Sequence, residues 1–416
     1  MNSYAVGSSQ QVVNSLPMVY NWQIGREMEY PYEERRPKRQ WAGVFDTNKC
    51  IGCQSCSLAC KTTWTNELGQ EYMMWNNVET KPYGFYPTGW DVKLLELLGP
   101  QKWQGNVYKG KTIFEATRSG EGTLGEPPNG NWSRWVGDKI HGGPDKMLGI
   151  TPDEMDWAHP NIGEDEIGGE IISRDAYIHS LPHPSWFFYL ARLCNHCTFP
   201  GCLAACPIQA IYKRDDDGIV LIDQGHCRGV RGCVKGCPYK KPMFNSVRGM
   251  SEKCIGCYPK IEQGLSPQCF EMCIGKIRIN GFLSLPENAN PENPIDFLVH
   301  EKKVALPLYP QFGTEPNIYY IPPIHAPPNF LNQLFGPGRE NALKTYKRAR
   351  DDEELLGLIH LFGSSEKTME SFKVQNGEAI GYDGKSNEVT RVPIMEPISV
   401  RDRYDRNLDV YRLDVT

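Results

Sequence analysis

The sequence predicts an α+β fold organised around two small cysteine-rich units, with a long irregular insertion and a partly helical C-terminal extension. Three observations support this prediction. All 15 cysteines of the 416-residue chain fall into four compact groups. Short apolar stretches of the kind that form strands adjoin these groups and recur along the chain. A helical pattern extends over residues 338–362, near the C-terminus.

The spacing within the cysteine groups indicates iron–sulfur ligands. In bacterial ferredoxins, closely spaced thiolates on one loop hold three corners of a cluster, and a fourth cysteine followed by proline ligates the neighbouring cluster. Pro207 and Pro238 follow such trailing cysteines in this chain. The four groups are Cys50, Cys53, Cys56 and Cys60; Cys194, Cys197, Cys202 and Cys206; Cys227, Cys233 and Cys237; and Cys254, Cys257, Cys269 and Cys273.

One ferredoxin-like unit is continuous in the sequence, at residues 186–243. It joins the second and third cysteine groups through a predicted β-hairpin. The strands of this hairpin are Ala210–Lys213 and Ile219–Ile222, and they flank the turn residues Asp215–Gly218. Two neighbouring clusters are therefore expected in this unit.

An internal repeat locates the second unit. Val44-Phe45-Asp46 precedes Cys50 just as Leu221-Ile222-Asp223 precedes Cys227. The first group thus corresponds to the third, and the strand-like residues after Cys273 make the fourth group correspond to the second. Pairing the first group with the fourth gives a second ferredoxin-like unit, related to the other by pseudo-twofold symmetry. Its halves are residues 41–62 and 244–284, and residues 63–185 are inserted after the first half.

Assigning the fourth cysteine of each loop to the partner cluster of its unit predicts four sites. Site A consists of Cys50, Cys53, Cys56 and Cys273. Site B consists of Cys254, Cys257, Cys269 and Cys60. Site C consists of Cys194, Cys197, Cys202 and Cys237. Site D has only Cys227, Cys233 and Cys206.

Site D lacks one ligand, and the spacing shows where. A four-cysteine loop would place the missing thiolate at Val230, three residues after Cys227 and three before Cys233. Because valine has no donor atom, a corner iron at this place would have no protein ligand. The sequence therefore predicts three [4Fe–4S] clusters and one [3Fe–4S] cluster. The alternative is that a hydroxide or a residue from elsewhere completes a fourth cube.

A zinc-stabilised interaction scaffold is the alternative from another functional class. Cys254 and Cys257 with Cys269 and Cys273 could, taken alone, form a zinc ribbon. A disulfide framework is disfavoured, because it belongs to small secreted domains. His196 lies inside the second group, but four cysteines already serve that site. Basic residues near the cysteine loops would help to balance thiolate-ligated clusters; they are Lys49, Lys61, Arg228, Arg231, Lys235, Lys240, Lys241, Lys253, Lys276 and Arg278.

The sequence carries no recognisable catalytic residues, since phosphate-binding glycine loops, nucleophile elbows and zinc-protease helices are absent. One-electron centres without a substrate site describe an electron relay. The net charge of −5 gives no reason to expect nucleic acid as a partner. No apolar run approaches the roughly 18 residues of a membrane helix, and no secretory signal is visible. Membrane contact is expected only through other chains of a complex.

The remaining segments give weaker predictions. Residues 1–40 are predicted to be an arm on another surface or a disordered leader. The insertion is predicted to be a subunit interface or to pack over the ferredoxin core, with a helix at Asp91–Leu98. In the C-terminal extension, 285–416, residues 286–328 are predicted to be extended and residues 338–362 to form one or two helices. The tail from residue 363 gives no prediction.

The cysteine loops resemble those of a known family. Cys-Arg-Gly-Val-Arg-Gly-Cys at 227–233 and Cys-Pro-Tyr-Lys-Lys at 237–241 are similar to the iron–sulfur beta subunits of membrane-associated molybdenum enzymes, in the respiratory nitrate reductase and type II dimethylsulfoxide reductase family. Residues 20–30, 75–87 and 347–352 are most similar to nitrite oxidoreductase beta subunits. Nitrate reductases usually carry Trp at the place of Val230, so the sequence departs from them there.

The resemblance implies an electron-transfer subunit of a complex that oxidises nitrite to nitrate. Its partners would be an alpha subunit with a molybdenum bis-pterin site and a haem-bearing gamma subunit, with electrons entering at sites A and B and leaving from sites C and D. The complex is expected on the periplasmic side of a membrane or in an organelle lumen, co-exported with a partner, or alternatively on the cytoplasmic face. The nearest alternative is a beta subunit of a nitrate, chlorate or selenate reductase or of a hydrocarbon dehydrogenase.

Overall fold

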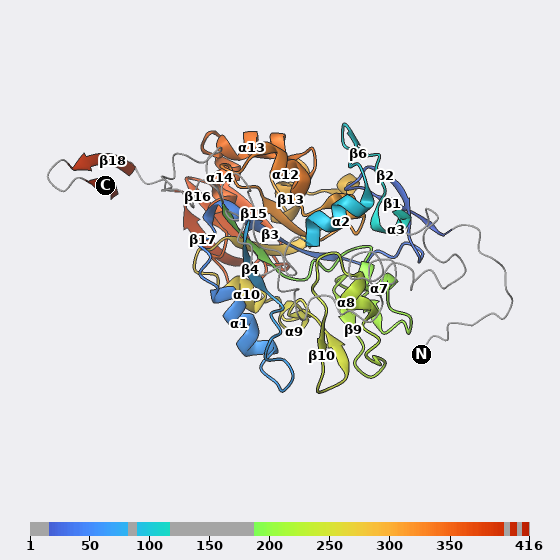
Figure 1. Cartoon of the computed structure of the whole chain (residues 1–416). Coiled ribbons are helices and arrows are strands. Elements are labelled where there is room, and N and C mark those ends of the chain that lie inside the picture. Colours follow the sequence, from blue (N-terminus) through green and yellow to red (C-terminus); the bar gives the residue numbers. More distant parts are fainter. Residues whose placement is uncertain (1–15, 82–89, 117–186, 395–399, 406–409, 416) are drawn as a thin grey trace, which may run out of the picture.

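A four-stranded sheet lies at the centre of the molecule (Figure 1). The computed structural model describes residues 16–81, 90–116, 187–394, 400–405 and 410–415. β3 (Gln40–Asp46) pairs antiparallel with β12 (Arg278–Leu283) and parallel with β14 (Ile318–Ile321), and β13 (Leu306–Pro307) pairs antiparallel with β14. The strand predicted before Cys50 is confirmed. It lies between two strands that are far from it in the sequence.

The central sheet separates two apolar cores. In β3, Trp41 and Phe45 belong to the core on the cysteine side, while Ala42 and Val44 belong to the core on the other side. This alternation follows from the two-residue period of a strand. All four side chains are fully buried. The cysteine loops therefore belong to the core on one face of the sheet, as do Leu331, Leu334 and Phe335, whereas the buried apolar residues of 355–379 belong to the core on the other face.

Two pairs of short elements carry the cysteines. α1 (Ser55–Trp64) packs against α10 (Gln268–Glu271), and α7 (Gly201–Ala204) packs against α8 (Gly232–Gly236). Figure 1 shows α1 and α10, then α9 (Tyr258–Ile261), then α8 and α7, following one another along the lower half of the molecule. A 3₁₀ turn, η1 (Thr47–Lys49), joins β3 to the first cysteine loop.

The predicted hairpin of the second unit is confirmed. β8 (Ile211–Lys213) pairs antiparallel with β9 (Val220–Ile222). In each unit, the strand that follows a trailing cysteine thus pairs with the strand that precedes a cysteine loop, because β12 follows Cys273 and β3 precedes Cys50. A further hairpin, β10 (Met243–Asn245) with β11 (Met250–Glu252), follows the third cysteine group.

The predicted insertion is described only in part. β4 (Asn77–Lys81) pairs antiparallel with β7 (Phe188–Arg192), which brings the first part of the insertion beside the residues that follow its end. The predicted helix is confirmed as α2 (Trp90–Leu98). The remaining elements are β5 (Trp103–Gln104), β6 (Val107–Tyr108) and α3 (Ile113–Ala116). Residues 82–89 and 117–186 lie outside the described residues, and so does most of the predicted subunit interface.

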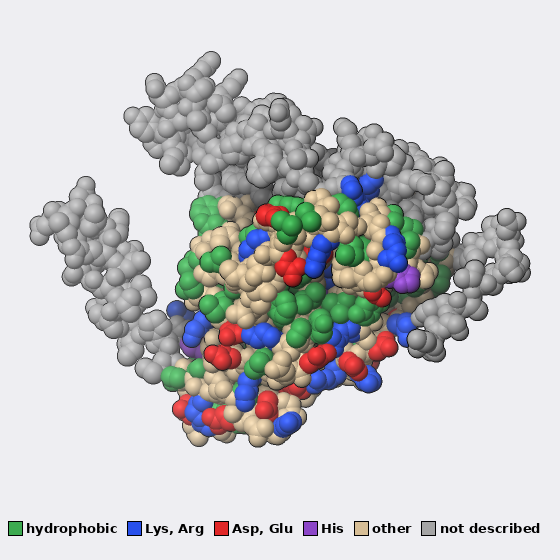
Figure 2. Space-filling view, turned by 90° about the horizontal axis from the view of Figure 1, so that it is seen from below, with side chains coloured by type: hydrophobic (Ala, Val, Ile, Leu, Met, Phe, Trp, Pro, Cys, Tyr) green, Lys and Arg blue, Asp and Glu red, His purple; other side chains and the backbone are tan. Residues whose placement is uncertain are grey.

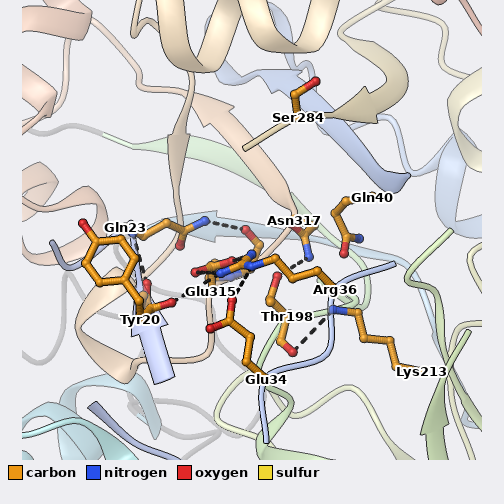
Figure 3. A network of polar contacts seen from close by, with 12 residues as sticks. Tyr20, Gln23, Glu34, Arg36, Gln40, Thr198, Lys213, Ser284, Glu315 and Asn317 are labelled. Carbon is orange, nitrogen blue, oxygen red and sulfur yellow. Dashed lines mark hydrogen bonds and ion pairs between the residues drawn. The ribbon is translucent and has the colours of Figure 1, made fainter. Parts of the chain in front are cut away.

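The N-terminal segment packs on its own chain. β1 (Met18–Asn21) and β2 (Arg26–Glu29) form a hairpin. Figure 3 shows Arg36 of this segment beside the buried Glu315; Arg36 Nη1 donates to Glu315 Oε1 at 2.7 Å. Burial raises the pKa of Glu315, and the charge of Arg36 opposes that shift. The prediction of a disordered leader is therefore wrong for residues 16–40, whereas residues 1–15 lie outside the described residues.

The C-terminal extension is more regular than predicted. Residues 286–328 contain the helical turns η3 (Pro286–Asn288), α11 (Pro294–Asp296), a π-helical turn η4 (Phe297–Glu301) and η5 (Pro310–Phe312), as well as β14, so the prediction of an extended stretch is wrong. The predicted helices are confirmed as α13 (Arg339–Lys347) and α14 (Glu353–His360), after α12 (Pro328–Phe335) and with the turn η6 (Ala349–Asp351) between them.

The tail forms strands that the sequence did not predict. β15 (Ser371–Gln375), β16 (Glu378–Tyr382) and β17 (Glu388–Pro393) make an antiparallel sheet against α14, and β18 (Val400–Asp405) pairs with β19 (Val410–Val415). Among the residues with a described position, no helix is long and apolar enough to cross a membrane.

Candidate iron–sulfur centres

The first and third cysteine loops have the same backbone. Gly52 and Gly229 lie two residues after Cys50 and Cys227, with φ of 67° and 66°. Gln54 and Arg231 follow two residues later, with φ of 61° and 66°, and each is the residue before a helix, α1 or α8. Two left-handed residues at the same spacing reverse each loop so that its flanking cysteines face one space.

Cys53 and Val230 occupy the same place in these two loops. Each lies between the two left-handed residues, three positions after the first cysteine. Both side chains are at the surface: Cys53 is exposed, and Val230 is 53% exposed. The loop that carries Val230 thus differs from the other at its ligand position and not in its path.

The cysteines predicted for site C line one cavity. Cys194, Cys197, Cys202 and Cys237 all line the same cavity. Cys202 lies in α7, and Cys237 follows directly after α8. The packing of these two helices therefore brings the second and third cysteine groups together. Lys241 and Lys253 also line this cavity.

The cysteines predicted for site B line a second cavity. Cys60, Cys254, Cys257 and Cys269 line it together with three tryptophans, Trp41, Trp64 and Trp75. Cys60 comes from α1 and Cys269 from α10, which pack against each other. A residue of the first cysteine group therefore completes the set that the fourth group supplies.

Electrostatic interactions show which thiols lie together at sites A and D. Burial raises the pKa of Cys50, and the nearby Cys56 and Cys273 add to this rise. Burial also raises the pKa of Cys233 to about 12, with contributions from Cys206 and Cys227. These neighbours are the residues that the sequence predicts for sites A and D.

The thiols fit iron–sulfur clusters in their chemistry as well as their placement. Burial raises the pKa of Cys60 to about 12 and the nearby Cys257 adds to the rise, while the charges of Lys241 and Arg278 oppose it. Bound iron would supply further positive charge and would take the place of the thiol proton. Within the described part of the chain, no three His, Cys, Asp or Glu side chains are placed to hold a single metal ion. The thiols instead surround spaces that can hold a larger group.

Comparisons with known proteins identify the family. A family model described as a 4Fe-4S dicluster domain matches residues 185–282, which contain the second, third and fourth cysteine groups. The selenate reductase beta subunit of Thauera selenatis is 42% identical over 325 residues, and the match covers 74% of this chain and 90% of the relative. The chlorate reductase beta subunit of Ideonella dechloratans is 44% identical, with the same coverage. The respiratory nitrate reductase beta subunit of Haloferax mediterranei is 42% identical, covering 75% and 86%. The chain belongs to this family of oxidoreductase beta subunits.

The predictions of an oxidoreductase subunit, of electron transfer and of iron–sulfur cofactors are thereby confirmed. The family model covers unit two and the second half of unit one, and it leaves the first cysteine group outside. None of the relatives named above is a nitrite oxidoreductase, so the comparisons support the beta-subunit family and not that member of it.

In this beta subunit, N–H groups also point at the ligand sulfurs. Trp64 Nε1 donates to Cys257 Sγ at 3.2 Å, and the backbone N–H groups of Ala210 and Ser251 donate to Cys206 Sγ and Cys227 Sγ at 3.3 and 3.5 Å. Sequence reasoning missed Trp64. The signal was available, because Trp64 lies four residues after Cys60 in α1 and so shares its helix face.

The predicted basic residues divide into three sets, of which one, Lys61, Arg231 and Lys235, is half-buried. Lys49, Arg228 and Lys276 are exposed. Lys240, Lys241, Lys253 and Arg278 are buried among the cysteine loops. Desolvation lowers the pKa of Lys240 and of Lys241 to about 7 in the chain alone, while neighbouring thiols oppose the shift. His196 is also buried, and its Nδ1 accepts the N–H of Val220 at 3.1 Å, which gives it a packing role.

Proposed function

We propose that this chain is the electron-transfer subunit of a membrane-associated nitrite oxidoreductase and that it binds three [4Fe–4S] clusters and one [3Fe–4S] cluster. The observation that carries the cluster assignment is the pair of cavities lined by four cysteines each, at sites B and C. Bound clusters would supply one-electron redox centres. The chain would hold these centres at fixed separations and keep most of their ligands away from water.

The proposed ligand sets are those predicted from the sequence. Site A takes Cys50, Cys53, Cys56 and Cys273; site B takes Cys254, Cys257, Cys269 and Cys60; site C takes Cys194, Cys197, Cys202 and Cys237; site D takes Cys227, Cys233 and Cys206. The equivalent backbone of loops 50–56 and 227–233 supports the assignment of three ligands to site D, because it puts Val230 at the place of Cys53.

The sites are proposed to follow one another in the order A, B, C, D. α1 carries Cys56 of site A and Cys60 of site B, one helical turn apart. The thiols of Cys254 and Cys194 interact across sites B and C. Cys233 and Cys237 interact in the same way across sites C and D. This linear order is what an electron relay between two partner subunits requires.

Exposed apolar side chains support partner contacts at both ends of the relay. Ile51, Leu58, Met272 and Ile274 are exposed beside the loops of site A, and Leu68, Val230 and Val247 are exposed beside those of site D. Figure 2 shows hydrophobic side chains gathered among both signs of charge on the face seen from below. Such patches are typical of protein interfaces. We assign the molybdenum bis-pterin alpha subunit to the site A end and the haem-bearing gamma subunit to the site D end.

Nitrite as the substrate rests on the similarity of residues 20–30, 75–87 and 347–352 to nitrite oxidoreductase beta subunits. Nitrite is a weak reductant, so at least two centres should lie toward the positive end of the iron–sulfur range of about −700 to +450 mV. A redox titration of the purified complex that finds all four centres strongly negative would contradict this assignment. A nitrate, chlorate or selenate reductase, or a hydrocarbon dehydrogenase, then becomes the better proposal.

The decisive experiment is purification of the chain with its partners. We expect iron, acid-labile sulfide and a large molybdenum subunit that turns over nitrite. A large subunit specific for another substrate would move the chain to another member of the family. A colourless chain that contains zinc and no sulfide would overturn the relay itself. The complex is proposed to lie on the periplasmic side of a membrane or in an organelle lumen.

A further inference from the structure

Four buried cations lie where neighbouring sites meet. One of them, Lys241, acts on Cys254 of site B and Cys194 of site C and also interacts with Glu79 and Arg192. The other three are Arg278, Lys253 and Lys240, with 2%, 3% and 5% of their surfaces exposed. Within the described residues, none of the three forms an ion pair with a carboxylate. Lys240 and Lys253 donate to backbone carbonyls, Lys253 also forms a hydrogen bond with the Cys194 side chain, and Arg278 donates to Asn76. A buried charge without an opposite charge costs several kcal/mol. Each of these residues therefore needs a negative group close by.

Arg278 lies between sites A and B. It interacts electrostatically with Cys56 and Cys273 of site A and with Cys269 of site B. Its charge also acts on the remaining site A thiols, Cys50 and Cys53, and on Cys60 of site B.

The position of the Arg278 guanidinium is fixed by its packing. It lies over the Phe45 ring, 4.4 Å from the centroid, and both terminal nitrogens are 3.4 Å from Asn76 Oδ1. Its Nε has no partner among the described protein atoms. These neutral contacts orient the group and leave its charge uncompensated by protein.

Lys253 and Lys240 repeat this arrangement further along the series. Lys253 interacts with Cys254 of site B and with Cys194 and Cys202 of site C. Lys240 interacts with Cys237 of site C and Cys233 of site D, and its ammonium lies 3.9 Å from the centroid of Trp90. Every junction in the order A, B, C, D thus contains a buried cation that reaches ligands of both sites.

We propose that Arg278, Lys253 and Lys240 are shared counter-ions, each placed so that its positive charge raises the reduction potentials of two consecutive centres at once. The inference rests on the cluster assignment made under the proposed function. Thiolate-ligated clusters are anionic, and reduction adds one electron without a proton, so a fixed positive charge stabilises the reduced form. Because each charge is buried, water screens it little and its effect on the two adjoining centres is large; since the interaction falls with distance, the effect on the other two centres is far smaller.

The inference is tested by neutral and charge-conserving substitutions in the complete complex. We expect Arg278→Met to lower the reduction potentials of sites A and B and to leave those of sites C and D unchanged. At sites A and B the one-electron reduction constant should change at least tenfold, which corresponds to a shift of about 59 mV in the potential. Arg278→Lys should restore most of the loss. Lys253→Met should shift only sites B and C, and Lys240→Met only sites C and D. The measurement is a redox titration followed by electron paramagnetic resonance.

Lys276→Met is the matched control. Lys276 lies three residues after Cys273 and near site A, but its side chain is exposed. Its removal should shift no potential by as much as twofold in the reduction constant, because solvent screens its charge. Iron and sulfide contents of every variant show whether all four centres are still present.

The pattern of shifts separates the outcomes. Equal shifts at all four centres, no shift at any centre, or equal behaviour of the Met and Lys variants at position 278 would overturn the inference while leaving the relay intact. Absence of iron and sulfide from the unmodified chain would instead overturn the proposed function. Should Arg278→Met fail to assemble, the two lysine variants decide the question by their paired shifts.

Discussion

Loops 50–56 and 227–233 have left-handed residues at the same two places, but they differ in the side chain between those residues. Their left-handed residues match within a few degrees, at Gly52 and Gly229 and again at Gln54 and Arg231. They differ at the position between, where one has a thiol and the other has an isopropyl group. The comparison teaches that the path of such a loop is set by its backbone conformation and packing. Under the proposed cluster assignment, a single side chain then decides the number of irons that the loop holds.

The two loops also differ in what supports them. A Cβ atom on Gly52 would lie 2.8 to 3.0 Å from the ring of Tyr189, which is a side chain. A Cβ atom on Gly229 would lie 2.3 Å from the carbonyl oxygen of Gly249, which is backbone. A side chain at position 229 would therefore meet the backbone of the β10–β11 hairpin, whereas one at position 52 would meet the Tyr189 ring.

The largest expected effect follows from this difference. Both Gly52→Ala and Gly229→Ala place a side chain at positive φ, which costs about 1–2 kcal/mol. Gly229→Ala adds a clash with backbone that cannot rotate away, so we expect loss of the site D signal and faster loss of cluster absorbance on heating. Gly52→Ala should keep all four centres. Equal damage in the two variants would show that the supports do not differ.

Cys53→Val should convert the site A loop into a copy of the site D loop. We expect the iron content to fall by about one per chain and a second three-iron signal to appear in the oxidised protein, because the corner iron loses its only protein ligand. Cys53→Ser is the matched control, since serine keeps a donor atom. The assignment of Cys53 to site A is wrong if its replacement by valine leaves the iron content unchanged.

Val230→Cys is the reverse conversion. We expect the three-iron signal of the oxidised protein to disappear and the iron content to rise by about one per chain. Val230→Ala keeps the side chain without a donor and should leave the signal in place. Survival of the signal in the cysteine variant would mean that site D is not the three-iron centre.

The smallest effects are expected at the left-handed residues that both loops share. Gln54→Ala removes the hydrogen bond from Ser57 Oγ to Gln54 Oε1, at 2.7 Å, and Arg231→Ala removes a guanidinium 3.9 Å from the centroid of Phe244. Each loss is about 0.5–1 kcal/mol. Urea-induced loss of cluster absorbance should shift slightly, with no change in iron content. A change in iron content in either variant would show that the side chain before the helix also affects how many irons the loop holds.

The sequence predicted the cysteine-bearing part of the molecule well because short-range spacing carries that information. The repeat of Val44-Phe45-Asp46 at residues 221–223 led to the correspondence of loops that the backbone angles support. The hairpin at 211–222 and the helix at 90–98 were predicted because turn residues and a helix stop adjoin them.

The rest depends on contacts between distant residues, which spacing does not reveal. The pairing of β3 with β14 and the ion pair of Arg36 with Glu315 join parts of the chain that show no related pattern. Proline-rich residues 286–328 were predicted to be extended, yet prolines at the first positions of α11 and η5 begin helical turns. The cations Arg278, Lys253 and Lys240 were named as neighbours of the loops, but their burial between sites could only be found in three dimensions.

The position of β3 has a consequence for biogenesis. During synthesis the ribosome releases Gln40–Asp46 long before Arg278–Leu283 and Ile318–Ile321, the strands on either side of it. The first cysteine group can therefore meet the fourth group only after Cys273 has been made, whereas the second and third groups, at residues 194–237, are complete earlier. A truncated polypeptide ending before residue 318 would leave one edge of β3 unpaired and prone to aggregation.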